Sequence, residues 1–225
     1  MTGDRMPVRI LTLQTIANVD DDLCRSLGLD ERHRSIGLIS TDCDDATYIA
    51  LDEATKAAAV DVVFARSLYA GAANASTRLA GEVIGILGGA NPSEVRSGLL
   101  AAARFLQAGA AFRSANADDT VVYLAHCIGS TGSYLSKLAR IPRGQALAYL
   151  IAPPVEAIVA LDAALKAADV RMAEFYAPPT ETNFAGALLT GSQSACFAAC
   201  EAFSGAVCAV AQTPQAIGGK ELGIG

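Results

Sequence analysis

Short apolar runs and helix-like segments alternate along the chain, and the whole alternation occurs twice. β-branched runs bounded by Gly, Pro or Asp predict strands near 9–17, 36–40, 61–64, 120–126, 148–152 and 170–173. Apolar and Ala residues spaced at i, i+3 and i+4 predict the main helices at 50–58, 93–106, 160–168 and 194–207. A further strand starts at the Ala-Gly pairs 80–81 and 185–186. We predict the order β-α-β-α-β-β-α for each half, which belongs to the α/β (α+β) fold class.

The strongest regularity is a sequence repeat. The segment ALDEATKAA at 50–58 recurs as ALDAALKAA at 160–168, with seven of nine residues identical and an offset of 110. The offset is close to half of the 225 residues. We therefore predict two copies of one unit, a first domain over 1–112 and a second over 113–225. Similar units in one chain can occupy nearly equivalent places in a ring, so three chains would supply six units.

Composition and charge exclude several classes of protein. Hydrophobic residues make up 52% of the chain, which is too apolar for a disordered protein. The formal net charge is -6 and no cluster of Lys and Arg is visible, so we expect neither nucleic acid nor a membrane as a partner. We identify no secretory signal and no run of about 20 residues apolar enough to span a bilayer. The expected location is therefore the cytoplasm.

No catalytic or metal-binding pattern is visible either. The sequence lacks a Gly-rich phosphate loop, an HExxH motif and a GxSxG motif, and its six cysteines fit no zinc pattern. The adjacent His126 and Cys127 would point to opposite faces of a strand, which argues against a catalytic pair. We therefore expect no enzyme, no metal and no cofactor.

Several segments resemble a known family. ALDAALKAADV at 160–170 resembles the signature helix of bacterial microcompartment (BMC) shell domains, and RSIGLISTDCDDATYIA at 34–50 is similar to the EutL type of these proteins. Further segments of the same likeness lie at 66–73, 109–112, 131–136 and 189–196. The resemblance implies two tandem, circularly permuted BMC domains, each a small, mostly antiparallel sheet flanked by helices.

The resemblance also implies a structural function. Proteins of this type form homotrimers, which are flat pseudohexagonal tiles that pack edge to edge with other shell proteins in the microcompartment wall. Ethanolamine utilisation is the implied setting, and a gated central pore would transport metabolites or cofactors. The implied pore-loop residues are Ser67, Leu68, Tyr69, Ala70, Gly71, Thr180, Glu181, Thr182 and Asn183.

Two lysines match the family's tile edge. Lys56 and Lys166 occupy the position of a lysine that lies against its counterpart on a neighbouring tile. The alternative is a local i, i+4 pair, Asp52 with Lys56 and Asp162 with Lys166, which contributes only about 0.2–0.5 kcal/mol. The recurrence in both halves fits either interpretation.

A group of acidic residues matches a ligand pocket of the family. Asp44 and Asp45 begin a predicted helix, and their alternative role is N-capping with support from the helix dipole. The resemblance implies instead a pocket for the protonated amine of ethanolamine, with carboxylates pairing the ammonium and aromatic faces adding cation–π attraction. Its predicted residues are Asp44, Asp45, Glu82, Glu156, Tyr69 and Phe112.

Two functions from different classes remain open at this level. The first is a shell tile, and the alternative is a small-molecule (amine) binding or sensor protein without lattice assembly. The oligomeric state separates them, because a sensor has no need of threefold tiles.

Overall fold

The first half of the chain forms a four-stranded antiparallel sheet, sheet 1, in the order β1-β2-β4-β3. The computed structural model describes residues 1–67, 83–178, 184–217 and 220–221. The strands are β1 (Ile10–Ile16), β2 (Ser35–Thr41), β3 (Val60–Ser67) and β4 (Val83–Gly89). The helices are α1 (Asp21–Leu27), α2 (Asp44–Ala57) and α3 (Pro92–Ala108).

The second half repeats this arrangement in sheet 2, with the order β5-β6-β7-β9-β8. Its strands are β5 (Arg113–Ser114), β6 (Val122–Ile128), β7 (Ala146–Ala152), β8 (Val170–Tyr176) and β9 (Ala185–Gly191). Its helices are α4 (Ser133–Leu138), α5 (Pro154–Ala167) and α6 (Gln193–Gln212). The short strands β10 (Ala216–Ile217) and β11 (Lys220–Glu221) pair with each other beyond α6. Apart from β5 and this pair, the predicted order β-α-β-α-β-β-α is confirmed in both halves.

The duplication extends to fine detail. The pairing of β3 with β4 shifts register between Val62 and Phe64, and the pairing of β8 with β9 shifts between Met172 and Glu174, again 110 residues on. The helices α2 and α5 end on Ala58 and Ala168, both in extended conformation. The two halves are therefore copies of one unit, whereas the boundary at 112/113 stays a prediction.

Polar side chains just before two of the helices explain why these helices begin where they do. The Asn91 side chain accepts a hydrogen bond from the Glu94 amide at 3.0 Å, and Pro92 follows it in the first turn of α3. Ser192 accepts from the Ala195 amide at 3.2 Å at the start of α6. These side chains satisfy amides that a helix start leaves without partners, and proline lacks such an amide.

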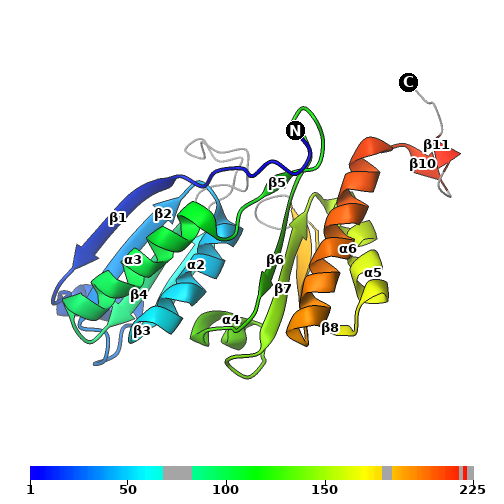
Figure 1. Ribbon diagram of the computed structural model, residues 1–225. Coiled ribbons are helices and arrows are strands. Elements are labelled where there is room, and N and C mark those ends of the chain that lie inside the picture. The colour runs from blue at the N-terminus through cyan, green and yellow to red at the C-terminus, as the bar shows by residue number, and fades with distance from the viewer. Residues whose placement is uncertain (68–82, 179–183, 218–219, 222–225) are drawn as a thin grey trace.

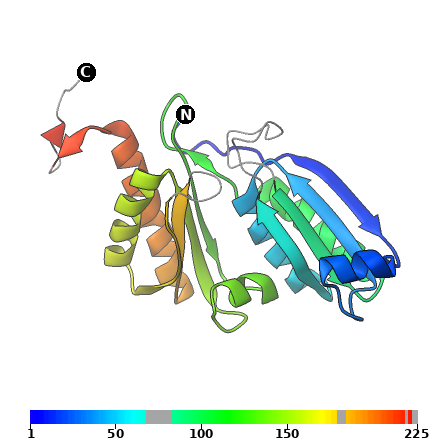
Figure 2. The ribbon, with the colours of Figure 1, turned by 180° about the vertical axis from the view of Figure 1, so that it is seen from behind.

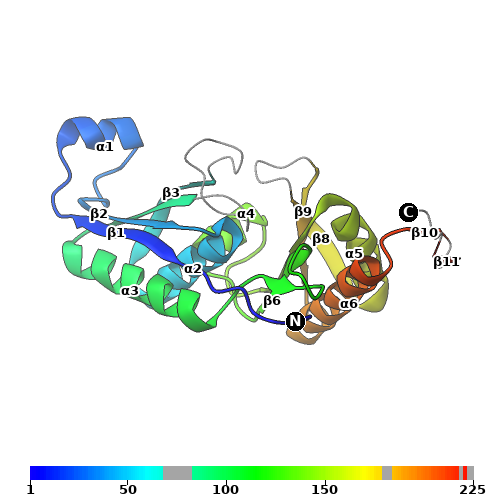
Figure 3. The same cartoon turned by 90° about the horizontal axis from the view of Figure 1, so that it is seen from above.

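The helices cover the two sheets unequally. In Figures 1 and 3, α2 and α3 cover one face of sheet 1, and α1 lies against the opposite face, here called the outer face. Figure 2 shows this outer face from behind, with α1 crossing one end of the strands. Helices α5 and α6 cover one face of sheet 2, and the other face of sheet 2 is turned toward α2 and α4. We call the contact of α2 with sheet 2 and α4 the joint.

The joint belongs to the main hydrophobic core. Ala46, Ile49 and Ala50 of α2 share one buried cluster with Leu147, Tyr149 and Leu188 of sheet 2. Ile49 and Leu147 are both fully buried. Burying such side chains contributes about 1.5–3 kcal/mol each, so the two halves form one continuous folded body.

Helix α6 differs from the sequence prediction. Within the described ranges, α6 is the one helix that is long and apolar enough to cross a membrane by length and composition, with a mean hydropathy of 1.6. The prediction that no stretch of the chain qualifies is therefore wrong for 193–212. A helix in the core of a globular protein passes the same test, and α6 buries Cys196, Phe203 and Val207 in the cluster beneath it. The described residues leave its other face uncovered, and Phe197 there is 56% exposed.

Candidate functional site

The most unusual chemistry of the joint lies at the start of α2, where two carboxylates are buried. Cys43 is the N-cap residue, so Asp44 and Asp45 stand inside the first turn, and the alternative role of Asp44 as N-cap is wrong. Asp44 is 4% exposed and Asp45 is 7% exposed. The Asp44 carboxylate accepts from the Asp45 amide at 2.8 Å and from the Ser67 hydroxyl at 2.5 Å. The end of β3 is thereby attached to the start of α2.

Asp45 faces the other half of the chain. The Tyr149 hydroxyl of β7 donates to the Asp45 carboxylate at 2.7 Å, across the joint. The Tyr48 hydroxyl lies 2.6 Å from that of Ser67, which extends the network to a second tyrosine. Tyr48 and Tyr149 are not among the site residues that the sequence predicts. The available signal was a tyrosine within the apolar strand AYLIA, because a buried hydroxyl needs a partner.

Burial makes the two carboxylates reluctant to ionise. It raises the pKa of Asp44 to about 6, against the opposing effect of the Ser67 hydroxyl and nearby amides. Burial also raises the pKa of Asp45 well above its usual range, and the charge of Asp44 raises it further. Neighbouring carboxylates out of water cannot both be charged at low cost, so the pair favours holding a proton or a cation.

The other predicted ligand residues do not all join this pair. Phe112 is fully buried in the main core and packs edge to face on Phe184, with ring centroids 5.3 Å apart. Glu156 lies in the first turn of α5, on the opposite side of sheet 2 from α2 (Figure 1). Within one chain Glu156 is therefore separate from Asp44 and Asp45. Glu82 and Tyr69 lie outside the described residues.

A third buried carboxylate fastens the joint at the middle of α2. Asp52 accepts hydrogen bonds from the amides of Gly132 at 2.6 Å and Leu135 at 2.8 Å, which begin α4. A Cβ on Gly132 would lie 2.6 Å from the Asp52 carbonyl oxygen, so only glycine fits there. Asp52 thus provides the N-terminal cap of α4 from 80 residues away.

The two candidate edge lysines have different surroundings. The Lys56 ammonium donates to the Ser130 carbonyl at 2.9 Å across the joint and pairs with Glu53. The predicted local pair of Lys56 with Asp52 is wrong, because the Asp52 carboxylate is occupied by α4. The Lys166 ammonium does form the predicted pair with Asp162, at 2.6 Å, and both side chains are largely exposed.

Of the predicted pore residues, only Ser67 belongs to the described part of the chain. It ends β3 and donates to Asp44. Leu68, Tyr69, Ala70, Gly71, Thr180, Glu181, Thr182 and Asn183 lie outside the described residues.

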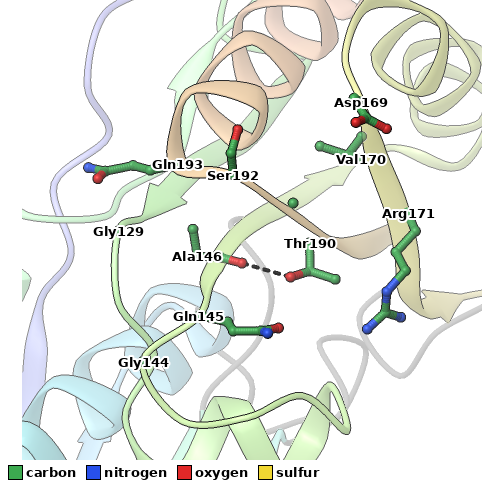
Figure 4. Close-up of a pocket in the computed structure, with 11 residues that line it drawn as sticks. Gly129, Gly144, Gln145, Ala146, Asp169, Val170, Arg171, Thr190, Ser192 and Gln193 are labelled. Carbon is green, nitrogen blue, oxygen red and sulfur yellow. Dashed lines mark hydrogen bonds between the residues drawn. The ribbon is translucent and has the colours of Figure 1, made fainter.

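Two open cavities occupy equivalent places in the two halves. The first-half cavity, about 580 Å³, lies beside the ends of α2 and β4, and the second-half cavity, about 640 Å³, lies beside the start of β8 and the end of β9. Figure 4 shows the second-half cavity, where the Thr190 hydroxyl donates to the Ala146 carbonyl at 2.9 Å. Among the described residues, no group of three or more His, Cys, Asp or Glu side chains is arranged to hold a metal ion.

Known proteins of similar sequence identify the family of this fold. A BMC domain model matches residues 35–116. The chain is 64% identical to the bacterial microcompartment shell protein EutL of Clostridium perfringens, over 95% of this chain and 99% of that one. It is 53% identical to EutL of Escherichia coli, over 91% and 94% of the two chains.

Solved structures agree with the sequence relatives. The crystal structure of the ethanolamine utilization protein EutL from Leptotrichia buccalis superposes with a TM-score of 0.92 at 62% identity, covering 96% of this chain and all of that one. Its relatives are shell proteins, so the expectation of a structural protein in place of an enzyme is confirmed by kinship. The chain belongs to the EutL family of bacterial microcompartment shell proteins.

Proposed function

We propose that three copies of this chain form a pseudohexagonal tile in the wall of an ethanolamine-utilisation microcompartment. The tile would pack edge to edge with other shell proteins, inside the cytoplasm. The setting follows the ethanolamine utilization named for the Leptotrichia relative. The main support for a threefold ring is the difference in exposure between the equivalent helices α2 and α5.

The same positions are covered on α2 and uncovered on α5. Asp45, Ile49 and Thr55 of α2 are at most 7% exposed, because the joint covers them. Their counterparts on α5 are Val155, Val159 and Leu165, which are 68%, 47% and 36% exposed. Ile158, the counterpart of the partly buried Tyr48, is 46% exposed. An apolar stripe on α5 thus faces solvent in the single chain and lacks the cover that α2 has.

The matching cover is available on the outer face of sheet 1. Leu38 pairs with Ile86 there, as Tyr149 pairs with Leu188 on the face of sheet 2 that α2 covers. Ile36 and Ile86 are buried beneath the short segment around α1, whereas Leu38, Val63 and Ile84 of the same face are only partly buried by the described residues. If α5 of one copy covers this face of the next, the joint is repeated between chains, and two unequal joints alternate around a closed ring.

The solution mass tests this proposal. Three chains of 23.1 kDa give about 69 kDa, which light scattering after size exclusion resolves from a monomer. A trimer supports the tile. A stable monomer contradicts it and favours the alternative, an amine-binding or sensor protein without a lattice.

The pore and its ligand form the second part of the proposal. Residues 67–71 and 180–183 would line a gated central pore for metabolites, and Asp44 and Asp45 would bind the ammonium group of ethanolamine near it. Support comes from the buried carboxylate pair, which gains from a cation in place of its proton, and from Ser67, which connects the first pore loop to Asp44. Tyr69, Phe112, Glu82 and Glu156 stay predicted members of this pocket.

Calorimetric titration with ethanolamine tests the pocket. Wild type should give binding heat, and Asp44→Asn and Glu82→Ala should abolish it. Glu156→Gln, which removes an equal charge from α5, shows whether Glu156 belongs to the same site. Equal heats in wild type and Asp44→Asn would remove the pocket from consideration.

The tile edge is the third part. We infer that Lys56 and Lys166 lie at the contact between neighbouring tiles. The double variant Lys56→Asp and Lys166→Asp should then keep trimers but lose sheets in electron microscopy. Sheets at the wild-type level would contradict the edge role.

A further inference from the structure

The two equivalent cavities differ in what closes them. The first-half cavity is lined by residues of both halves, because Ser133 and Arg143 of the second half reach it across the joint. The second-half cavity is lined by second-half residues alone, from 129 to 193. Val60 and Gly89 in the first cavity correspond to Val170 and Gly191 in the second, each a pair of strand partners. The second cavity therefore has wall residues equivalent to those of the first, but no described residue from a neighbouring domain lines it as Ser133 and Arg143 line the first.

Arg143 makes the decisive contact in the first cavity. Its guanidinium donates to the Thr55 carbonyl in the last turn of α2 at 3.0 Å. Carbonyls in the last turn of a helix have no partner within the helix, and the dipole makes this end attractive to a cation. Arg143 therefore supplies from the second half a cap that α2 does not supply itself.

The second cavity offers the same end of a helix and an added charge. Leu165 of α5 corresponds to Thr55, and its carbonyl accepts no side-chain hydrogen bond within the described ranges. Asp169 stands where the first cavity has Ala59, and Figure 4 shows it on the wall beside Arg171. No ion pair of Asp169 occurs in the described part of the chain. Asp169 and the helix end both attract a guanidinium, and Arg171, which lines the same cavity, opposes that attraction in part.

The counterpart of Arg143 in the first half is Arg32. Each of the two arginines stands three residues before the first residue of its strand, Ser35 of β2 or Ala146 of β7. The Arg32 side chain is 75% exposed, pairs with Asp30 two residues away at 2.8 Å and lies 4.0 Å from the Asp61 carboxylate. An exposed pair of this kind is worth about 0–1 kcal/mol, so Arg32 can exchange partners at little cost.

We propose that Arg32 of a second copy enters the second-half cavity, donates to the Leu165 carbonyl and pairs with Asp169. This inference rests on the proposed ring and names the residues that complete its joint between chains. The contact also fixes the relative position of the two chains. An apolar stripe alone would let one chain slide along the other, whereas the guanidinium must reach one particular carboxylate and one particular helix end. Arg32 and Arg143 would then perform the same task at alternate joints.

A charge-swap experiment tests the pairing. Arg32→Glu and Asp169→Arg should each raise the trimer dissociation constant at least about tenfold in a sedimentation dilution series, which is the size of one good ion pair. The double variant restores opposite charges but leaves the Leu165 carbonyl without a donor, so it should recover part of the loss and associate more tightly than either single variant. Arg96→Glu, an equal charge reversal on the exposed side of α3, is the control and should leave the constant unchanged.

The outcomes separate the pairing from the ring. A trimeric wild type with Arg32→Glu indistinguishable from Arg96→Glu overturns the pairing and leaves the ring standing. A double variant as dissociated as its parents also overturns it, because the two charges then do not meet. A monomeric wild type overturns the ring and the pairing with it. Far-UV circular dichroism of each variant confirms that dissociation reflects association and not unfolding.

Discussion

Helices α2 and α5 are copies of one element with different surroundings. They share ALD at their centre, the same length and the same ending, yet α2 is buried on the side that α5 exposes. The difference arises from their neighbours, since sheet 2 covers this side of α2 and none of the described residues covers the equivalent side of α5. A repeated sequence therefore predicts the shape of an element, whereas its exposure depends on what stands next to it.

The chemistry of the two helix faces is opposite to what exposure alone predicts. The buried face of α2 carries Asp45, Tyr48 and Asp52, and the exposed face of α5 carries Val155 and Ile158. A joint inside one chain can hold charged groups, because the fold keeps their partners in place. A joint between chains needs apolar area that gains free energy when two copies meet. The contrast explains why an acidic network occurs on one helix and not on the other.

The largest expected effect comes from charging the exposed stripe. Ile158→Asp should raise the trimer dissociation constant at least about a hundredfold, because burying an unpaired carboxylate costs several kcal/mol. Light scattering over a dilution series measures the change.

Ala163→Glu is the matched control for that variant. It adds the same charge to α5 at the position whose counterpart on α2 is already Glu53. Its trimer should be as stable as wild type. If Ile158→Asp and Ala163→Glu associate equally well, the stripe is not the contact.

The next effect is a difference in folding stability between variants of the equivalent residues Asp52 and Asp162. Asp52→Ala leaves two amides of α4 without partners and should lower the free energy of unfolding by about 3 kcal/mol. Asp162→Ala removes one exposed pair and should change it by less than about 0.5 kcal/mol. Denaturant titration in the Ile158→Asp background measures both, since association then makes no contribution. Equal losses would show that Asp52 does not fasten the joint.

The last expected effect is a pH dependence that arises from the two buried carboxylates at the start of α2. The pKa of Asp44 rises on folding from its usual 3.8 to about 6, so the folded state holds a proton that the unfolded state releases. This contribution to stability is complete below about pH 4 and is lost as the pH rises through 6, with a total of up to about 3 kcal/mol. The raised pKa of Asp45 extends the loss to higher pH.

Asp45→Asn tests that dependence. The amide keeps a carbonyl oxygen for Tyr149 and removes one of the two competing charges, so stability should change less between pH 5 and pH 8 than in wild type. Denaturant unfolding at the two pH values measures the difference. If the free energy of unfolding changes between pH 5 and pH 8 as much as in wild type, the pH dependence comes from other groups.

The repeat made most of the fold predictable from sequence. The match of 50–58 with 160–168 located both central helices, and the apolar runs located the strands around them. The long-range partners were not predictable. Local spacing favoured Asp52 with Lys56, but the Asp52 carboxylate binds amides 80 residues away. The link from Tyr149 to Asp45 spans 104 residues and depends on how the halves dock, which no local pattern encodes.

The covalent connection between the halves changes how steeply the equilibrium amount of closed ring depends on protein concentration. At equilibrium, the concentration of a ring of six separate units is proportional to the sixth power of the free unit concentration. For three fused pairs the ring concentration is proportional to the third power. The connection holds each pair at a high effective concentration, so alternate joints exist before any encounter between chains. In a dilute cell the ring would therefore persist at protein levels where six single units would remain dispersed.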